Sequence, residues 1–191
     1  MDDSKDYVGC IFLVKKTRPA GRIIRWFQKK FLNLGDSDEY THIGIIAPDG
    51  KAFEAMPWGV AYRDFHYFDN NEVYPILKII RPINMPSDEE LWKFMTKHKG
   101  KMYSFIQILG IPLFRWMLHT SFTRVKKVLN WILRTKLFSA GEICTENVHE
   151  YLTESVGDME AVALNKNFLT VSELDKYLDP SKDYDVAYDQ L

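Results

Sequence analysis

Cys144 stands at the start of an expected amphipathic helix, in the stretch 141–152 with the sequence GEICTENVHEYL. Val148, Tyr151 and Leu152 follow it at helical spacing, so one apolar stripe begins at the cysteine itself. A thiol in the first turn of a helix faces unpaired backbone N–H groups and the positive end of the helix dipole, which favour the thiolate. With a histidine nearby in space, such a cysteine can act as a nucleophile. The alternative is a small apolar side chain buried under the helix.

The histidine best placed to meet this thiol is His42, which opens an apolar run at 42–47. A Pro-Asp-Gly turn at 48–50 and a second run at 51–56 follow, which predicts a β-hairpin. With a three-residue turn, the numbers of facing residues sum to about 98, so His42 faces position 56 and lies diagonally from Glu54. A carboxylate at one imidazole nitrogen fixes the tautomer and leaves the other nitrogen to take a proton from a thiol.

The remaining histidines fit this chemistry less well, and we expect them in solvent or at helix ends: His66, His98, His119 and His149. His149 lies about 140° around the helix from Cys144, which keeps it from the thiol. A metal site built from His42, Glu54 and Cys144 has suitable ligand types, but no paired cysteines or His-Glu-x-x-His motif support it. We therefore expect no metal, and in the absence of a Gly-rich phosphate loop no cofactor.

The elements that must position these residues can be read from periodicity and turn signals. The expected strands are 7–14, 41–47, 51–56, 59–63 and 72–81, and the expected helices are 21–34, 87–100, segments of 105–137, the Cys144 helix and 170–178. Strands clustered before most of the helices predict an α+β fold, in which helices pack on an antiparallel sheet. We expect one domain over 1–191, with an ordered core at about 7–178 and a flexible tail at 179–191.

Composition fits one globular domain, since 46% of the 191 residues are hydrophobic and 14% are aromatic. The N-terminus is acidic and polar, unlike a signal peptide, and the apolar stretch 103–118 is interrupted by polar residues and falls short of a transmembrane span. The expected location is cytoplasmic, where Cys144 stays a free thiol.

A net charge of −1 conceals two basic segments, 15–30 and 101–138, each with seven Lys or Arg residues and no acid. Aromatic and aliphatic residues interleave with these charges. Such segments lie at membrane interfaces in some proteins and are ordinary surface helices in others. A peripheral contact with an anionic membrane is thus one expectation. Nucleic acid binding is not expected, because the chain as a whole is not basic.

Several short motifs in order resemble the circularly permuted papain-like cysteine hydrolases of the NlpC superfamily, most closely the YiiX-type branch and more distantly lecithin:retinol acyltransferase-like proteins. These motifs are THIGI at 41–45, EA at 54–55, KIIRP at 78–82, GKMY at 100–103, CTENV at 144–148 and LTVSEL at 169–174. The resemblance runs from about 7 to 178. Positions 145 and 171 depart from it, with Thr and Val where Ser and Pro are common.

The resemblance implies a permuted papain-like fold and a site. Cys144 matches the nucleophile, His42 the general base and Glu54 the orienting third member, while Tyr103 matches a pocket-lining position. The substrate would be a peptide, an amide, or an acyl or lipid-linked molecule, handled by hydrolysis or transfer. The segment 103–138 reads as a helical, basic and apolar insertion before the cysteine. The alternative is a non-catalytic lipid- or peptide-binding module on the same scaffold.

Overall fold

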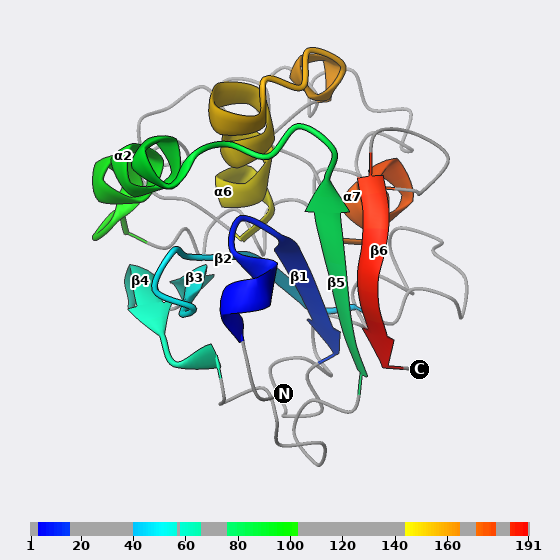
Figure 1. Cartoon of the computed structure of the whole chain (residues 1–191), viewed down its shortest axis with the longest axis horizontal. Helices are drawn as coiled ribbons and strands as arrows, with labels where there is room; N and C mark the ends of the chain where they lie inside the picture. The colour runs from blue at the N-terminus through cyan, green and yellow to red at the C-terminus, as the bar shows by residue number, and fades with distance from the viewer. Residues whose placement is uncertain are drawn as a thin grey trace, which may run out of the picture.

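The computed structural model describes residues 4–15, 40–56, 58–65, 76–102, 144–164, 171–178 and 184–190. These residues build an antiparallel six-stranded sheet in the order β4-β3-β2-β1-β5-β6 (Figure 1). The strands are β1 (Ile11–Lys15), β2 (His42–Ile46), β3 (Ala52–Met56), β4 (Gly59–Arg63), β5 (Ile76–Pro82) and β6 (Tyr184–Gln190). The expected class, an antiparallel sheet with helices packed on it, is confirmed.

Helices gather on one face of this sheet (Figure 1). They are α2 (Asp88–His98), α6 (Cys144–Tyr151) and α7 (Val171–Tyr177), with a π-helical turn η3 (Leu152–Val156) and the 3-10 turns η1 (Ser4–Tyr7) and η4 (Ala161–Ala163). Strand residues that alternate along the sheet, such as Ile11, Ile43 and Ile45, form one core cluster with the buried faces of these three helices. The intervening residues, such as Phe12 and Ile46, form a second cluster on the other face.

The hairpin of β2 and β3 has the expected register. Ile45 faces Phe53 and Ile46 faces Ala52, so the facing numbers do sum to 98. The turn closes through a 2.8 Å hydrogen bond from Gly50 N–H to the carbonyl of Ala47, and Gly50 takes a φ of 79° that favours glycine. The Asp-Gly signal in the sequence therefore predicted the pairing of the two strands that carry His42 and Glu54.

The expected capping box at 87–90 is also present. Ser87 accepts a hydrogen bond from Glu90 N–H, and the Glu90 side chain accepts one from Ser87 N–H at 2.8 Å. Helix α2 ends at His98, and Gly100 follows with a φ of 82°. Gly100 N–H and the Lys101 carbonyl then pair with the backbone of Val60 in β4, which ties the end of this helix to the sheet.

The C-terminal end differs from expectation, because 184–190 form β6 instead of a flexible tail. This strand pairs with β5 along its length, from Tyr184 opposite Pro82 to Gln190 opposite Leu77. The segment is polar because β6 is an edge strand whose outward residues meet water, whereas Tyr184 is buried. Polarity alone was therefore the wrong guide to order at this end.

Other expectations lie outside the described residues: the helix at 21–34, the insertion 103–138 and, with it, Tyr103. The first expected strand begins later than predicted, at Ile11, after the turn η1. None of the helices in the described part of the chain has the length and apolar character needed to cross a lipid bilayer.

Candidate active site

His42 and Glu54 meet inside the sheet. His42 is the first residue of β2, Glu54 is the middle residue of β3, and His42 Nε2 pairs with Glu54 Oε2. A carboxylate only accepts, so Nε2 carries the proton of this contact. Any proton that the imidazole takes from another group must then enter through Nδ1. The diagonal arrangement expected from the hairpin register is confirmed.

Glu54 is fully buried and has a second partner, which is a cation. Its other oxygen, Oε1, lies 2.9 Å from Nε of Arg63 on the neighbouring strand β4. A carboxylate removed from water is costly unless its charge is paired and hydrogen-bonded. Arg63 supplies the opposite charge at Oε1, while Oε2 contacts His42. The sequence reasoning missed Arg63, although its place on the strand next to β3 is the signal that would have found it.

An aromatic ring packs beside the His42 imidazole. The ring centroid of Phe12 on β1 lies 6.4 Å from that of His42, with a tilted geometry. Phe12 fits there because β2 carries glycine at 44: a Cβ on Gly44 would lie 2.5 Å from the Phe12 ring and 2.9 Å from the Phe53 carbonyl oxygen. The glycine of the His-Ile-Gly sequence thus has a packing role, since it admits the ring that packs beside His42.

Cys144 is the first residue of α6, as the sequence predicts, and the residue is 9% exposed. It belongs to the same core cluster as Ile43 and Val148, and helix α6 packs on the face of β2 that carries Ile43 and Ile45. Figure 1 shows α6 standing over this part of the sheet. Glu146, in the first turn, is buried and carries a charge whose sign favours a helix N-terminus.

The far end of α6 is fixed by a buried tyrosine. Tyr151 donates a 2.6 Å hydrogen bond from its hydroxyl to the carbonyl of Gly9, just before β1. Burial, together with the nearby Cys10, raises the pKa of Tyr151 well above its usual value, so the hydroxyl stays a donor. Helix α6 is therefore anchored to the first strand, which limits how far its Cys144 end can move.

Asn147 is a residue that the sequence reasoning did not single out. It lies one turn after Cys144, is fully buried, and makes no hydrogen bond through its amide to the residues that the structure describes. An unpaired buried amide costs free energy, of the order of 1–3 kcal/mol. The helix of the candidate nucleophile thus retains a polar group whose partner the described fold does not supply.

His98 ends a helix, as expected, but both His98 and His149 are buried instead of lying in solvent. His98 has no exposed surface, because it lies on the same helical stripe as Leu91 and Phe94 and stacks on the Phe94 ring at 4.2 Å. His149 donates from Nε2 to the Ala161 carbonyl at 2.8 Å, which ties α6 to η4. His66 and His119 lie outside the described residues.

Comparison with known proteins assigns no family to the chain. No protein-family model matches it, and no curated protein matches its sequence. The chemistry of the site is therefore argued from its own residues: a buried histidine–carboxylate pair on two strands, and a cysteine that opens the helix packed on them.

Proposed function

We propose that the protein is a cysteine hydrolase or acyltransferase in which Cys144 is the nucleophile, His42 the general base and Glu54 the residue that orients His42. The observation that carries the proposal is the buried His42–Glu54 pair on β2 and β3, at the positions that alternate with Ile43 and Phe53, which face the Cys144 helix. The proposal adds one contact, between Cys144 Sγ and His42 Nδ1. The His42 ring packs beside Phe12, so this contact requires the ring to reach Cys144 around the strand end that His42 opens.

In the first half-reaction His42 Nδ1 takes the proton of the Cys144 thiol, which leaves a thiolate beside an imidazolium. The thiolate attacks the carbonyl carbon of an amide, peptide or ester, and the carbonyl electron pair moves to the oxygen. When the tetrahedral intermediate collapses, the bond to the leaving group breaks and Nδ1–H protonates that group. The product of this step is a thioester on Cys144.

In the second half-reaction water, or another nucleophile in a transferase, attacks the thioester carbon. His42 Nδ1 takes the proton of the attacking group, and Cys144 departs as a thiolate. Glu54 stays ionised through both steps, paired with Arg63 on one oxygen and with His42 on the other. Its charge stabilises the imidazolium that forms and fixes the ring so that Nδ1 is the working nitrogen.

Backbone N–H groups at the start of α6 supply the oxyanion site in this proposal. The first N–H groups of a helix have no intrahelical partner and carry the positive end of its dipole. Removing an asparagine side chain that donates to the oxyanion in another hydrolase costs about 100-fold to 1,000-fold in kcat. The proposed arrangement is that of the circularly permuted papain-like hydrolases, with the histidine strand preceding the cysteine helix in the chain.

The proposed substrate is a peptide, an amide, or an acyl or lipid-linked molecule, and the amphiphilic kind is favoured by the basic and apolar sequence at 101–138. A peripheral contact with an anionic membrane surface accompanies that choice. Co-sedimentation with liposomes that contain phosphatidylserine should then fall steeply as salt rises. Failure to sediment at low salt would remove the membrane contact but leave the chemistry of Cys144 intact.

The chemistry is tested by trapping. Intact-mass spectrometry after incubation with panels of peptide, N-acyl and phospholipid substrates should show an acyl adduct on Cys144, and the adduct mass identifies the substrate class. Cys144→Ala and His42→Ala should both fold and form no adduct, whereas Cys10→Ala should retain it. Full turnover by Cys144→Ala would refute the covalent route. Binding of a lipid or peptide without turnover, equal in Cys144→Ala, would indicate the non-catalytic module.

A further inference from the structure

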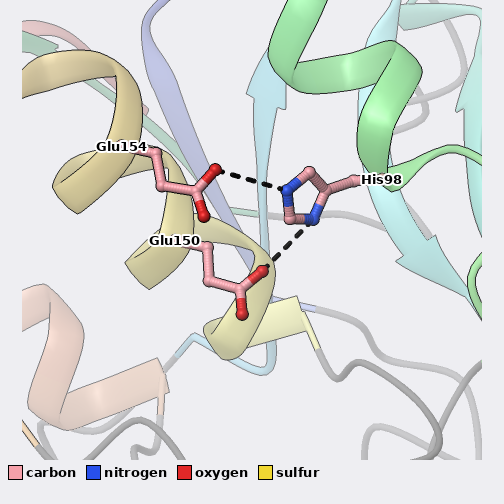
Figure 2. A group of neighbouring side chains, drawn as sticks. All are labelled: His98, Glu150 and Glu154. Atoms are coloured by element: carbon pink, nitrogen blue, oxygen red, sulfur yellow. Dashed lines mark ion pairs between the residues drawn. The ribbon is translucent and has the colours of Figure 1, made fainter.

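A second cluster of titratable side chains lies at the other end of α6, away from Cys144. His98, the last residue of α2, has no exposed surface and faces two carboxylates (Figure 2). Its Nδ1 lies 3.2 Å from Oε2 of Glu150 in α6, and its Nε2 lies 3.7 Å from Oε2 of Glu154 in η3. A buried imidazole therefore joins α2 to the helix that begins at Cys144.

Two lysines complete the cluster. Lys101 Nζ lies 3.0 Å from His98 Nδ1 and 3.7 Å from Glu150 Oε2. Lys97 Nζ lies 2.7 Å from both oxygens of Glu154. Among the described residues, these are the charged groups that face His98. With a neutral imidazole, the two lysines and two glutamates balance in charge.

A metal ion fits this arrangement poorly, although the cluster has suitable ligand atoms within 4.8 Å of one another. The two carboxylates approach different nitrogens of the ring (Figure 2), so an ion bound at one nitrogen lies away from the carboxylate at the other. Lys97 already bonds both oxygens of Glu154, Lys101 lies 3.7 Å from Oε2 of Glu150, and both ammonium groups would repel a cation. The cluster is therefore suited to binding a proton on the His98 ring and not a metal ion.

His98 Nδ1 has two competing neighbours, and the protonation state decides between them. An ammonium group only donates, so the contact with Lys101 requires a lone pair on Nδ1 and places the single ring proton on Nε2, toward Glu154. Once the ring is protonated, Nδ1–H repels the ammonium and instead donates to Glu150. One proton thus exchanges the partner of Nδ1.

We propose that His98 is a proton-operated latch, in which protonation exchanges Lys101 for Glu150 and tightens the link between the end of α2 and α6. Lys101 is coupled to the sheet, since its carbonyl accepts a 2.9 Å hydrogen bond from Val60 N–H at the start of β4. The latch therefore joins α2, α6 and β4. It depends on the cluster alone and not on catalysis by Cys144.

Ring nitrogen NMR of the full chain labelled with 15N-histidine tests the latch without any activity measurement. Lys101→Met removes the donor of the neutral state and should raise the titration midpoint of His98, whereas Glu150→Gln removes the acceptor of the protonated state and should lower it. We expect each shift to be about 0.5 pH unit or more, about threefold in proton affinity. At high pH the spectra should show the proton on Nε2.

Two controls isolate the effect. His149, which lies in α6 beside Glu150 and donates to the Ala161 carbonyl in η4, should give the same ring-nitrogen spectra in both variants. Lys51→Met, which removes an exposed lysine paired with Asp49, should leave His98 unchanged. The proposal is overturned if neither cluster variant moves His98, if the high-pH proton is on Nδ1, or if Zn²⁺ or Mn²⁺ binds one-to-one and shifts the His98 resonances.

Discussion

His42 Nε2 donates a hydrogen bond to Glu54 Oε2 inside the sheet, across β2 and β3, although the two residues lie twelve positions apart in the chain. The hairpin register puts them diagonally opposite, and Nε of Arg63 lies 2.9 Å from Oε1 of Glu54. This relationship fixes which imidazole nitrogen carries a proton. It leaves Nδ1 as the nitrogen through which His42 would act on a thiol.

Glu54→Gln tests the orienting role of the carboxylate. The amide keeps the size of the side chain but can present its NH₂ group to Nε2, which favours the opposite tautomer. We expect the rate of thioester formation on Cys144 to fall about 100-fold or more, by analogy with loss of the orienting carboxylate in other triads. Asp49→Asn, at an exposed acid in the hairpin turn, is the control and should retain the rate. A Glu54→Gln protein as active as wild type would show that the carboxylate does not orient His42.

Arg63→Gln tests whether this cation stabilises the buried charge. Removing one partner of a buried ion pair typically costs about 3–5 kcal/mol, because the other charge is left in a poorly solvated place. We expect the free energy of unfolding, measured with urea, to fall by about 3 kcal/mol. The double variant Glu54→Gln/Arg63→Gln should recover part of that loss, since it leaves no isolated charge.

Lys51→Gln provides the comparison for Arg63, because Lys51 makes an exposed ion pair with Asp49. Its loss should cost less than about 1 kcal/mol. Equal losses for Arg63→Gln and Lys51→Gln, with no recovery in the double variant, would mean that Arg63 does not neutralise Glu54.

Asn147→Leu should make the protein more stable. The buried amide makes no hydrogen bond to the described residues, and leucine has a similar size without the unpaired polar atoms. We expect a gain of about 1 kcal/mol in the free energy of unfolding. Asn84→Leu, at an exposed asparagine, is the control and should bring no such gain. Destabilisation by Asn147→Leu would show that the amide is satisfied in solution.

We expect Asp158 to make a contribution to the free energy of unfolding that depends on pH. Burial alone would raise the pKa of this carboxyl, but hydrogen bonds from the Tyr177 and Tyr184 hydroxyls and from the N–H groups of Ala161 and Glu160 outweigh it and hold the pKa below its usual value. Burial and the Asp158 contact raise the pKa of both tyrosines, so they remain donors. The carboxylate therefore joins α7 and β6 to the loop after η3.

Because the pKa of Asp158 is lowered in the folded state, its stabilisation is present above about pH 4, the ordinary value for aspartate, and is lost as pH falls through the folded value. Asp158→Asn should lower the free energy of unfolding, measured with urea at pH 7, by about 2 kcal/mol. This effect should shrink as the pH approaches 3. Asp185→Asn, at an exposed acid on β6, should change little at either pH. An Asp158→Asn effect that is the same at both pH values would contradict the assignment.

Parts of the fold could be predicted because local signals determine them. The Asp-Gly turn sets the register of β2 and β3, and the Ser87–Glu90 box sets the start of α2. The same register argument could have found Arg63: Met56 faces Gly59, so Ala52 faces Arg63, diagonally from Glu54. The burial of His98 was also legible, since it continues the helical stripe of Leu91 and Phe94.

Other features depend on contacts between distant segments and leave no local pattern. Strand β6 is polar and pairs with β5 about a hundred residues earlier in the chain, so its order comes from the sheet edge that receives it. The anchoring of Tyr151 to Gly9 likewise joins residues 142 positions apart. The catalytic roles of Cys144, His42 and Glu54 stay predictions, and so does the pocket role of Tyr103, which lies outside the described residues.

The most direct test of the account is the pH dependence of Cys144 alkylation by iodoacetamide, followed peptide by peptide in wild type and His42→Ala. Cys10 is the internal reference, because burial raises the pKa of its thiol more than the Arg81 contact lowers it. We predict rapid labelling of Cys144 at pH 6 in wild type, and labelling that requires about pH 8 or above once His42 is removed. Wild-type Cys144 that reacts only above about pH 8, or that reacts identically without His42, would contradict the account.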